Sequence, residues 1–409
     1  MQIISFRSSF CLLQLTCYLF IFNNLAYSQT VSPKTISMNQ AVTLTLANNP
    51  ISKNTVLYIK AAKNQSLSNI ELAPTEINYA NGQFYSTVND SYFEINQHLG
   101  SPLTYIQKAK YNKQAVKLSE VEQKIVLKNL SAEAKIAYTK CVYQQVKWNT
   151  TKNLNILYNK ILAITGTPYN QKDTNQLSRV TAETSFANFQ NQLFQAEQDY
   201  KLACNNLEQL TCTTGEFAPV DSSLELYAIE ILNSGSNKFS PTTNISLYNE
   251  ALILNQRKIN LQQSKLFPEF TFGYFNHEIN GARGFQGFKL GIAIPIWYLP
   301  QKAQIAEARI NLEIAKNELD YQKSTLNRTI ENLKIELDKL FVDISFYREN
   351  ALKKADLLIQ SVNLNYQKKE INYSSLFENL ESALKIQVDY LEKVDLYNKA
   401  AIQLESLID

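Results

Sequence analysis

The sequence has few of the side chains that most catalytic and metal centres require. Its 409 residues include only two histidines, His98 and His277, and we find no metalloprotease, nucleophile-elbow, Walker or dinucleotide-binding motif. An enzyme would need acid, base or metal ligands that converge in a pocket. The formal charge of +3 is too balanced to predict nucleic-acid binding. We therefore expect no catalysis, no cofactor, no resident metal and no nucleic-acid partner.

Long hydrophobic runs are confined to the N-terminus. Residues 1–28 are predicted to be an export signal, with a positive charge at Arg7, an apolar core from Phe10 to Phe22 and a small-x-small cleavage site that ends at Ser28. Beyond this segment, no run of about 18 apolar residues occurs, which is the minimum for a membrane-spanning helix. If the chain crosses a membrane, we expect it to do so with β-strands.

Cysteines are also scarce. Beyond residue 28 the chain contains only Cys141, Cys204 and Cys212. This odd number, without C-x-x-C spacing, predicts neither a disulfide framework nor a zinc site. We expect buried or inert thiols, because unpaired cysteine behaves as a small apolar residue.

The chain carries one pattern of elements twice. A helical run from Ser37 to Leu72 is followed by two predicted strands and a long helix, and a second run from Ser246 to Leu266 is followed by the same succession. The turns that define both repeats contain prolines, namely Pro74, Pro102, Pro268 and Pro295. Each half therefore has the predicted order helix, two strands, long helix and shorter helix.

The ends of the two halves also correspond. The segment YKLACNNLEQL, which starts at Tyr200, matches YNKAAIQLESL, which starts at Tyr397. The pattern predicts a first repeat over residues 29–210, an inter-repeat (equatorial) linker over 211–243 and a second repeat over 244–409. The linker is rich in Ser, Thr, Asn, Pro and Gly, with one short helix expected at residues 224–232.

The predicted strands have one apolar and one polar face. The apolar residues from Phe288 onward occupy every second position, at Phe288, Leu290, Ile292 and Ile294. Strands of about ten residues cross a bilayer when tilted, although the same alternation also fits a half-buried soluble sheet. Four strands cannot close a barrel, so a membrane location requires several copies of the chain.

The predicted helices are too long for a compact core. Residues 301–366 contain neither proline nor glycine and can form one helix close to 100 Å long. A heptad series of leucines indicates coiled-coil packing, at Leu312, Leu319, Leu326, Leu333 and Leu340. A companion helix is expected from Pro102 to Thr165, and half-length helices over 176–210 and 374–408. A soluble helical bundle or rod explains these helices taken alone.

Three sequence phrases resemble the TolC-type outer-membrane efflux family: ISMNQAVTLTLANNP from Ile36, the strand-proline-helix phrase over residues 266–308, and the C-terminal phrase from Tyr366. The resemblance implies a mainly α fold with a small membrane β-barrel part. It implies a homotrimer with a twelve-stranded barrel among outer-membrane lipid and a twelve-helix tunnel in the periplasm of a Gram-negative bacterium. The implied partners are a periplasmic adaptor and an inner-membrane efflux pump.

The resemblance also assigns two adaptor-contact tips, at the turns between long and short helices. They comprise Asp173, Asn175, Gln176 and Leu177 in the first half and Tyr373, Ser374, Ser375 and Leu376 in the second. The first tip is longer than the family pattern, and the second has Lys369 and Glu370 where the family often has glycine.

The phrase FEINQHLGSPLTYIQKAK resembles relatives of heavy-metal cation pumps, which suggests metal cations or small toxic compounds as cargo. Acidic residues at Asp338, Glu349 and Asp356 are candidates for the lumen or for solvated helix faces. The competing hypothesis is a periplasmic coiled-coil adaptor or scaffold without a pore.

Overall fold

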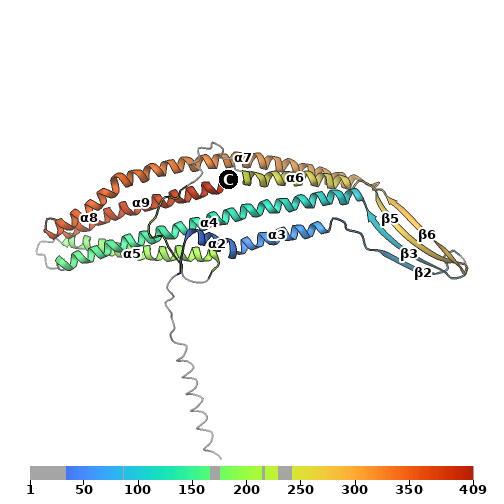
Figure 1. The fold of residues 1–409 in the computed structure, drawn as a ribbon, viewed down its shortest axis with the longest axis horizontal. Coiled ribbons are helices and arrows are strands. Elements are labelled where there is room, and N and C mark those ends of the chain that lie inside the picture. The colour runs from blue at the N-terminus through green and yellow to red at the C-terminus, as the bar shows by residue number, and fades with distance from the viewer. Residues whose placement is uncertain (1–33, 86, 166–175, 214–216, 229–241, 409) are drawn as a thin grey trace, which may run out of the picture.

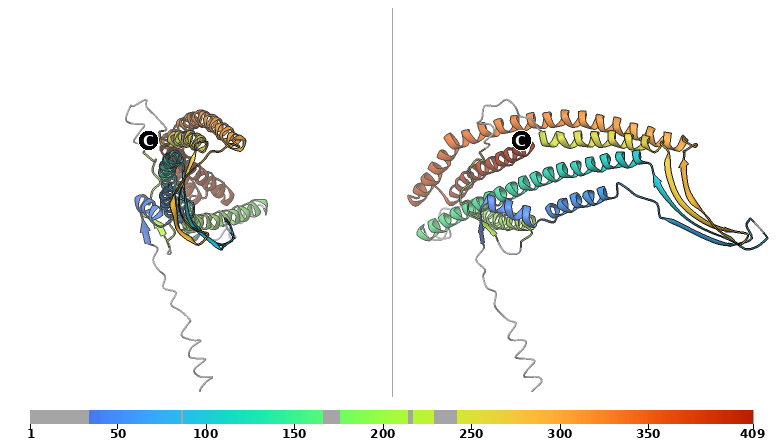
Figure 2. Two further views of the ribbon diagram at one scale, coloured as in Figure 1. Left: turned by 90° about the vertical axis from the view of Figure 1, so that its right-hand side faces the viewer. Right: turned by 45° about the vertical axis from the view of Figure 1, so that its right-hand side comes forward.

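The molecule is a long helical body with a β-sheet at one end and a helical turn at the other (Figure 1). The computed structural model describes residues 34–85, 87–165, 176–213, 217–228 and 242–408. Within them, the long helices lie side by side along the body, and the sheet extends beyond their ends, as the right-hand view of Figure 2 shows. This mainly helical architecture with a few strands is the predicted fold class.

The two halves contribute corresponding elements, in the order leading helix or helices, two strands, a long helical row and a final helix. The first half comprises β1 (Lys34–Ile36), α2 (Met38–Asn48), α3 (Pro50–Leu67), β2 (Glu76–Gly82), β3 (Asp90–Gly100), α4 (Pro102–Thr165) and α5 (Gln176–Thr211). The second comprises β4 (Phe217–Pro219), α6 (Thr242–Ser264), β5 (Glu269–Ile279), β6 (Ala282–Ala293), α7 (Leu299–Phe346), the π-helical turn η3 (Tyr347–Ala351), α8 (Leu352–Gln367) and α9 (Tyr373–Leu407).

The leading helical run is broken, whereas we expected one helix from Ser37 to Leu72. The chain forms α2 and α3, because Pro50 has no N–H to continue a helix and begins a new one instead. Asn49 caps the new helix, since its Oδ1 accepts a hydrogen bond from the Ile51 N–H at 2.9 Å. Its Nδ2 donates to the Leu210 carbonyl at the end of α5, at 3.0 Å. The cap therefore also joins the leading helices to α5.

The long helix of the second half is nearly continuous, as predicted. It runs through α7 and α8 and is interrupted only by η3, a single π-helical turn. A π-turn inserts one extra residue, which rotates the buried stripe on either side of it. On one side of the turn the buried residues include Leu340 and Ile344, and on the other Ala355 and Val362. The helix row therefore changes its packing face where it approaches the tip.

Short helices complete the rows beside the long ones. In Figure 1, α3, α2 and α5 follow one another along α4, while α6 and α9 follow one another along α7 and α8. The half-length helices expected over residues 176–210 and 374–408 are present as α5 and α9. Each row of half-length helices is thus about as long as its neighbour.

The linker differs from the expectation. No helix occurs in its described residues 221–228, and residues 229–232 of the expected helix lie outside the described part of the chain. Instead, β4 pairs in parallel with β1, with Thr35 opposite Ala218. A three-residue pair this far apart in sequence leaves no periodic signal, so sequence reasoning missed it.

The linker is fastened to the helices by Tyr227. Its N–H donates to Asn398 Oδ1 at 2.7 Å, and Asn398 Nδ2 donates to the Glu225 carbonyl at 2.8 Å. Its hydroxyl donates to Glu405 at 2.7 Å and accepts from Lys135 at 2.8 Å. Burial lowers the pKa of Lys135, but the hydrogen bonds with Glu405 and Tyr227 outweigh burial and leave that pKa raised.

Two clusters of buried apolar side chains join the helices at the waist and at the tip. The waist cluster surrounds the linker and joins α2, α4, α5, α7 and α9; its members include Ile36, Tyr138, Cys141, Val142, Cys204, Leu207, Phe217, Ile344 and Val394. The tip cluster lies between α4, α5, α8 and α9 and includes Leu154, Tyr158, Phe189, Val362, Leu376, Phe377 and Leu380. Burial of a large apolar side chain contributes about 1.5–3 kcal/mol, so these clusters hold the hairpins together.

Candidate functional site

The four long strands form one antiparallel sheet in the order β2-β3-β5-β6. Ile77 pairs with Ile95, Ile95 with Tyr274, and Tyr274 with Phe288, so one row crosses the whole sheet. β5 and β6 are joined by Asn280 and Gly281, both with positive φ, of 52° and 76°. This is the two-residue turn that asparagine-glycine favours between twisted strands.

One face of the sheet is apolar and exposed. This apolar face consists of Ile77, Tyr79, Phe93, Ile95, Phe270, Phe272, Tyr274, Phe288, Leu290 and Ile292, which the register places on the same side. Leu290 is 84% exposed and Phe288 74%. Apolar patches of this kind on a soluble monomer mark a surface that meets a membrane or another protein. The alternation of apolar and polar residues predicted from Phe288 onward is thus present in β6.

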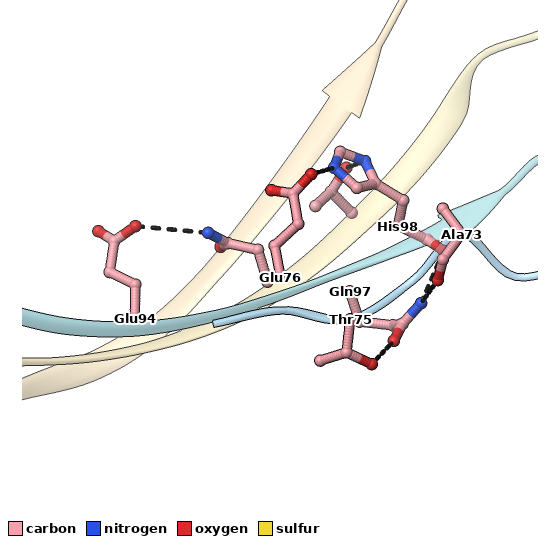
Figure 3. A network of polar contacts seen from close by, with 8 residues as sticks. Ala73, Thr75, Glu76, Glu94, Gln97 and His98 are labelled. Carbon is pink, nitrogen blue, oxygen red and sulfur yellow. Dashed lines mark hydrogen bonds and ion pairs between the residues drawn. The ribbon is translucent and has the colours of Figure 1, made fainter. Parts of the chain in front are cut away.

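The opposite face is polar and holds both histidines. Figure 3 shows one of them, His98, beside Glu76. The Nε2 of His98 lies 3.7 Å from Glu76, and its Nδ1 lies 3.2 Å from the Thr271 hydroxyl. The Nε2 of His277 lies 3.8 Å from Glu94. These polar groups come from three strands, so the register collects them on one side of the sheet.

Charge and small residues complete this polar face. Lys289 Nζ lies 4.0 Å from Glu94. A Cβ on Gly273 would lie 2.4 Å from the Asn96 side chain, and one on Gly287 would lie 2.7 Å from Phe275. Glycine at these positions lets neighbouring side chains lie across the strand. The face is thus partly covered by its own side chains, and its carboxylates outnumber its ammonium groups.

Asp90 joins the two hairpin ends at the tip of the sheet. Its Oδ2 accepts hydrogen bonds from the backbone N–H groups of Phe84 and Tyr85, at 3.2 and 2.7 Å. Its Oδ1 accepts from the N–H of Asn280 at 2.9 Å. The side chain is buried, at 1% exposure. One carboxylate therefore ties the β2–β3 loop to the β5–β6 turn.

Both outer edges of the sheet are open. β2 and β6 each pair with one described strand only, so their other edges carry backbone groups without a strand partner in the described chain. All three pairings are antiparallel, so β2 and β6 run in opposite directions. An edge β6 of one copy can consequently pair with an edge β2 of another in the same antiparallel sense.

The repeat-defining prolines lie where helices and strands meet. Pro74 lies between α3 and β2, Pro102 begins α4, Pro268 directly precedes β5, and Pro295 follows β6. Before Pro102, Gly100 has a φ of +66°, and a Cβ there would lie 2.3 Å from the Tyr105 hydroxyl. That hydroxyl donates to the Leu99 carbonyl at 2.7 Å. The sheet is therefore connected to α4 through a tight, hydrogen-bonded bend.

At the other end of the molecule, the turn after α8 is well defined. The N–H of Glu370 donates to the Asn365 carbonyl at 2.8 Å, and the N–H of Lys369 donates to the Tyr366 carbonyl at 3.0 Å. Lys369 has a φ of 61°. These features make a Schellman motif, whose left-handed position glycine usually occupies. The lysine found where the family often has glycine thus adopts the conformation that glycine would adopt.

The second tip lies at the start of α9, directly after the turn that joins α8 to α9. Asn372 caps the helix by accepting a hydrogen bond from the Ser375 N–H at 2.8 Å. Ser374 donates to Glu378 at 3.2 Å. Tyr373 packs on Phe377 with ring centroids 5.3 Å apart. Tyr373, Ser374 and Ser375 are partly exposed.

Leu376 has a different place in this tip. It is fully buried, at 0% exposure, in the tip cluster. In the single chain it supports the turn from inside rather than presenting a surface. At the first tip, Asp173 and Asn175 lie outside the described residues, and Gln176 and Leu177 begin the backbone of α5. Adaptor contact at both tips stays a prediction.

The remaining candidate residues lie on the surface. Asp338, Glu349 and Asp356 are all exposed, which fits either a lumen or a solvated helix face. No group of three or more metal-ligating side chains occurs within the described chain. Among the same residues, none of the helices combines the length and apolarity needed to cross a membrane.

The sequence matches no family model and no curated protein. Solved structures nevertheless share its fold. CusC, whose structures concern folding and transmembrane channel formation, matches with a TM-score of 0.71 and 14% identity, over 94% of this chain and 95% of that one. The CmeC outer-membrane channel of Campylobacter jejuni matches with a TM-score of 0.74 and 12% identity, over 93% and 90%.

The MtrE outer-membrane channel of Neisseria gonorrhoeae, in its open state, matches with a TM-score of 0.64 and 15% identity, over 89% of this chain and 88% of that one. Nearly the whole length of each protein is therefore shared, from sheet to tip. The chain has the fold of these outer-membrane channels, and the resemblance expected from the sequence is confirmed at the level of the fold.

Proposed function

We propose that three copies of this chain form an outer-membrane exit channel that lets cargo pass without consuming energy itself. The observation that carries the proposal is a sheet with an apolar exposed face, a polar opposite face and two open edges of opposite direction, at the end of a long helical body. In a bilayer, an apolar outward face meets lipid, while a polar inward face lines the passage.

The open edges require several copies. An unpaired backbone group in lipid costs several kcal/mol, so the sheet of one chain cannot remain open there. Two copies would close a barrel of eight strands, whose interior side chains fill. Three copies would close one of twelve strands, which leaves room for a passage. A homotrimer is therefore the smallest closed assembly that can conduct.

The helical body also has surface for neighbouring copies. Several apolar side chains on α3 and α7 are 57–67% exposed in the single chain, namely Val56, Leu57, Tyr58, Ile310, Tyr321, Ile335 and Val342. On long helices, such stripes meet other helices. Three copies placed around one axis would bury them and continue the passage below the sheet.

The proposed lumen favours cations. Glu76, Glu94 and Glu269 lie on the polar face of the sheet, against one ammonium group at Lys289. Threefold repetition makes rings of carboxylates, which attract cations in pores. This excess, together with the sequence resemblance, is the basis for proposing metal cations or small toxic compounds as cargo.

The proposed partners are those that would supply the energy for transport. No nucleotide-binding motif occurs in the sequence, so cargo has to be delivered by a pump. We propose an inner-membrane efflux pump that acts through a periplasmic adaptor, with the adaptor at the turn that contains Tyr373, Ser374 and Ser375. The protein would then lie in the outer membrane, with its helices in the periplasm.

A periplasmic coiled-coil scaffold is the competing function. It would use the same long helices, but its sheet would not need an apolar face with Leu290 84% exposed. A scaffold would also leave the edges of β2 and β6 as sites for uncontrolled pairing. The channel accounts for both features.

Cross-linking between copies tests the proposal. In a cysteine-free background, Tyr79→Cys on β2 and Leu290→Cys on β6 are expressed in the same cells on separate chains. The channel predicts disulfide-linked dimers only when both variants are present, because β2 of one copy lies beside β6 of the next. Leu290→Cys is replaced in turn by Phe288→Cys and Ile292→Cys, since the register between copies sets which position links. Absence of cross-links in all three combinations would refute barrel closure.

A further inference from the structure

Two cysteines from different helices meet in the waist cluster. Cys141 of α4 and Cys204 of α5 are both buried, and their Sγ atoms lie 2.8 Å apart. The S–S bond of a disulfide is about 2.05 Å long, so a movement of less than about 1 Å would bring the two sulfurs to bonding distance. The third described cysteine, Cys212, is exposed, and its sulfur contacts the Gln209 carbonyl at 3.4 Å.

We propose that Cys141 and Cys204 form a disulfide bond that locks α4 to α5 at the waist of the molecule. The proposal rests on the proposed function in one respect, because a periplasmic location supplies an oxidising compartment. The two thiols lose two protons and two electrons as the S–S bond forms. A disulfide-bearing oxidant accepts them, and its own disulfide is reduced to two thiols.

The bond would form before the helices pack. Thiol–disulfide exchange requires a thiolate that the oxidant can reach. In the folded chain, the hydrogen bond with Cys204 and burial both raise the pKa of the Cys141 thiol, and both sulfurs are covered. Oxidation therefore belongs to the exported, still unfolded chain. Once α4 and α5 have packed, the same burial shields the disulfide from reductants.

The lock would distinguish the two helical hairpins. It closes a loop over a sequence separation of 63 residues, which includes the first tip. In the matched C-terminal segments, Ala401 stands where the first repeat has Cys204, and Ala401 is also fully buried. The α4–α5 hairpin would thus be covalently fixed at the waist, while α9 is held there only by non-covalent contacts, such as the ion pair of Lys393 with Asp343 at 3.4 Å. Movements of the second tip could then extend further along the body than those of the first.

Peptide mapping tests the proposal. The chain is expressed with residues 1–28 so that it is exported, and the protein is then recovered from the cell envelope without reductant, denatured in N-ethylmaleimide and digested. We expect the Cys141 and Cys204 peptides to be linked to each other and Cys212 to be alkylated. Two alkylated peptides, or a link to Cys212, would overturn the disulfide. The outer-membrane fraction of the same preparation reports separately on the proposed function: trimers there with alkylated Cys141 and Cys204 would refute the disulfide alone.

Thermal unfolding gives a second readout. The double variant Cys141→Ala/Cys204→Ala is compared with Cys212→Ala. Because a disulfide that closes a long loop constrains the unfolded chain, the double variant is expected to unfold about 5 °C lower or more, and Cys212→Ala to be unchanged. Reductant present during unfolding should lower the value for the native chain and leave the double variant unaffected. Equal values for the native chain with and without reductant would contradict the lock.

Discussion

Replacing Asn398 should release the linker from the helical body. The Asn398 amide, at 1% exposure, accepts from the Tyr227 N–H and donates to the Glu225 carbonyl. Its orientation is fixed, because one partner can only donate and the other can only accept. Asn398→Ala removes both hydrogen bonds and leaves two backbone groups without a protein partner.

The structure gives the size of the effect. Each lost hydrogen bond contributes about 1 kcal/mol net, and a backbone group left without a partner costs about 1–3 kcal/mol. We expect Asn398→Ala to lower the free energy of local opening at the linker by about 3 kcal/mol, which accelerates amide exchange at Tyr227 roughly a hundredfold. Asn398→Asp keeps the acceptor but loses the donor, and it should accelerate exchange at least as much because a carboxylate then faces the Glu225 carbonyl.

Hydrogen exchange followed by mass spectrometry measures this opening on the peptide that contains Tyr227. The matched control is Lys399→Ala, which changes the next residue of α9 on an exposed position. We expect the control to leave exchange at the linker unchanged. If Asn398→Ala exchanges at the native rate, the linker is held by other contacts, and the role assigned to Asn398 is wrong.

Three further predictions address the tip, the waist and the sheet. Lys369→Gly should raise the free energy of unfolding by about 1 kcal/mol, because a residue with a Cβ is strained at a φ of 61°. The control Lys368→Gly, one residue earlier with a φ of −78°, should lower that free energy. Equal shifts of the unfolding temperature in the two variants would contradict the strain assigned to Lys369. Burial raises the pKa of Tyr143 to about 12, whereas an unfolded tyrosine ionises near pH 10. The contribution of Tyr143 to stability is therefore complete below about pH 10 and is lost as the pH rises toward 12. Tyr143→Phe should flatten the decline of the unfolding temperature over that range. An unchanged slope would refute the burial effect assigned to Tyr143. Leu290→Lys places a charge on the apolar face and should destabilise the membrane form by about 2–4 kcal/mol if the residue lies near the bilayer midplane. Lys289→Gln, on the polar face, should leave the heat resistance of the assembled protein unchanged. Gel electrophoresis of heated samples compares the two variants, and equal heat resistance would contradict the assignment of the faces.

Periodic features could be predicted from the sequence. The heptad leucines identified the long helix that became α7 and α8, and the alternation from Phe288 identified β6 with its correct faces. Both patterns are local, because a helix or strand places neighbouring residues on one side whatever the rest of the chain does. The break at Pro50 was missed even though its cause is equally local.

Contacts between distant segments could not be predicted. Cys141 and Cys204 belong to helices whose relative register no spacing rule sets, so the sequence alone indicated only inert thiols. Asp90 and Asn280 meet because the hairpins of both repeats lie side by side, which requires the β3–β5 register. The left-handed conformation of Lys369 could not be predicted either, because local preference favours glycine at that position.

The most direct test of the central claim is the conductance of the purified assembly in a planar bilayer. Detergent-extracted outer membranes are resolved on a native gel, and the species recovered is added to the bilayer. The account predicts a trimer that conducts in discrete steps and prefers cations, with a weaker preference when Glu94→Gln reduces the carboxylates of the polar face. A water-soluble species that does not conduct would contradict the channel and favour the coiled-coil scaffold.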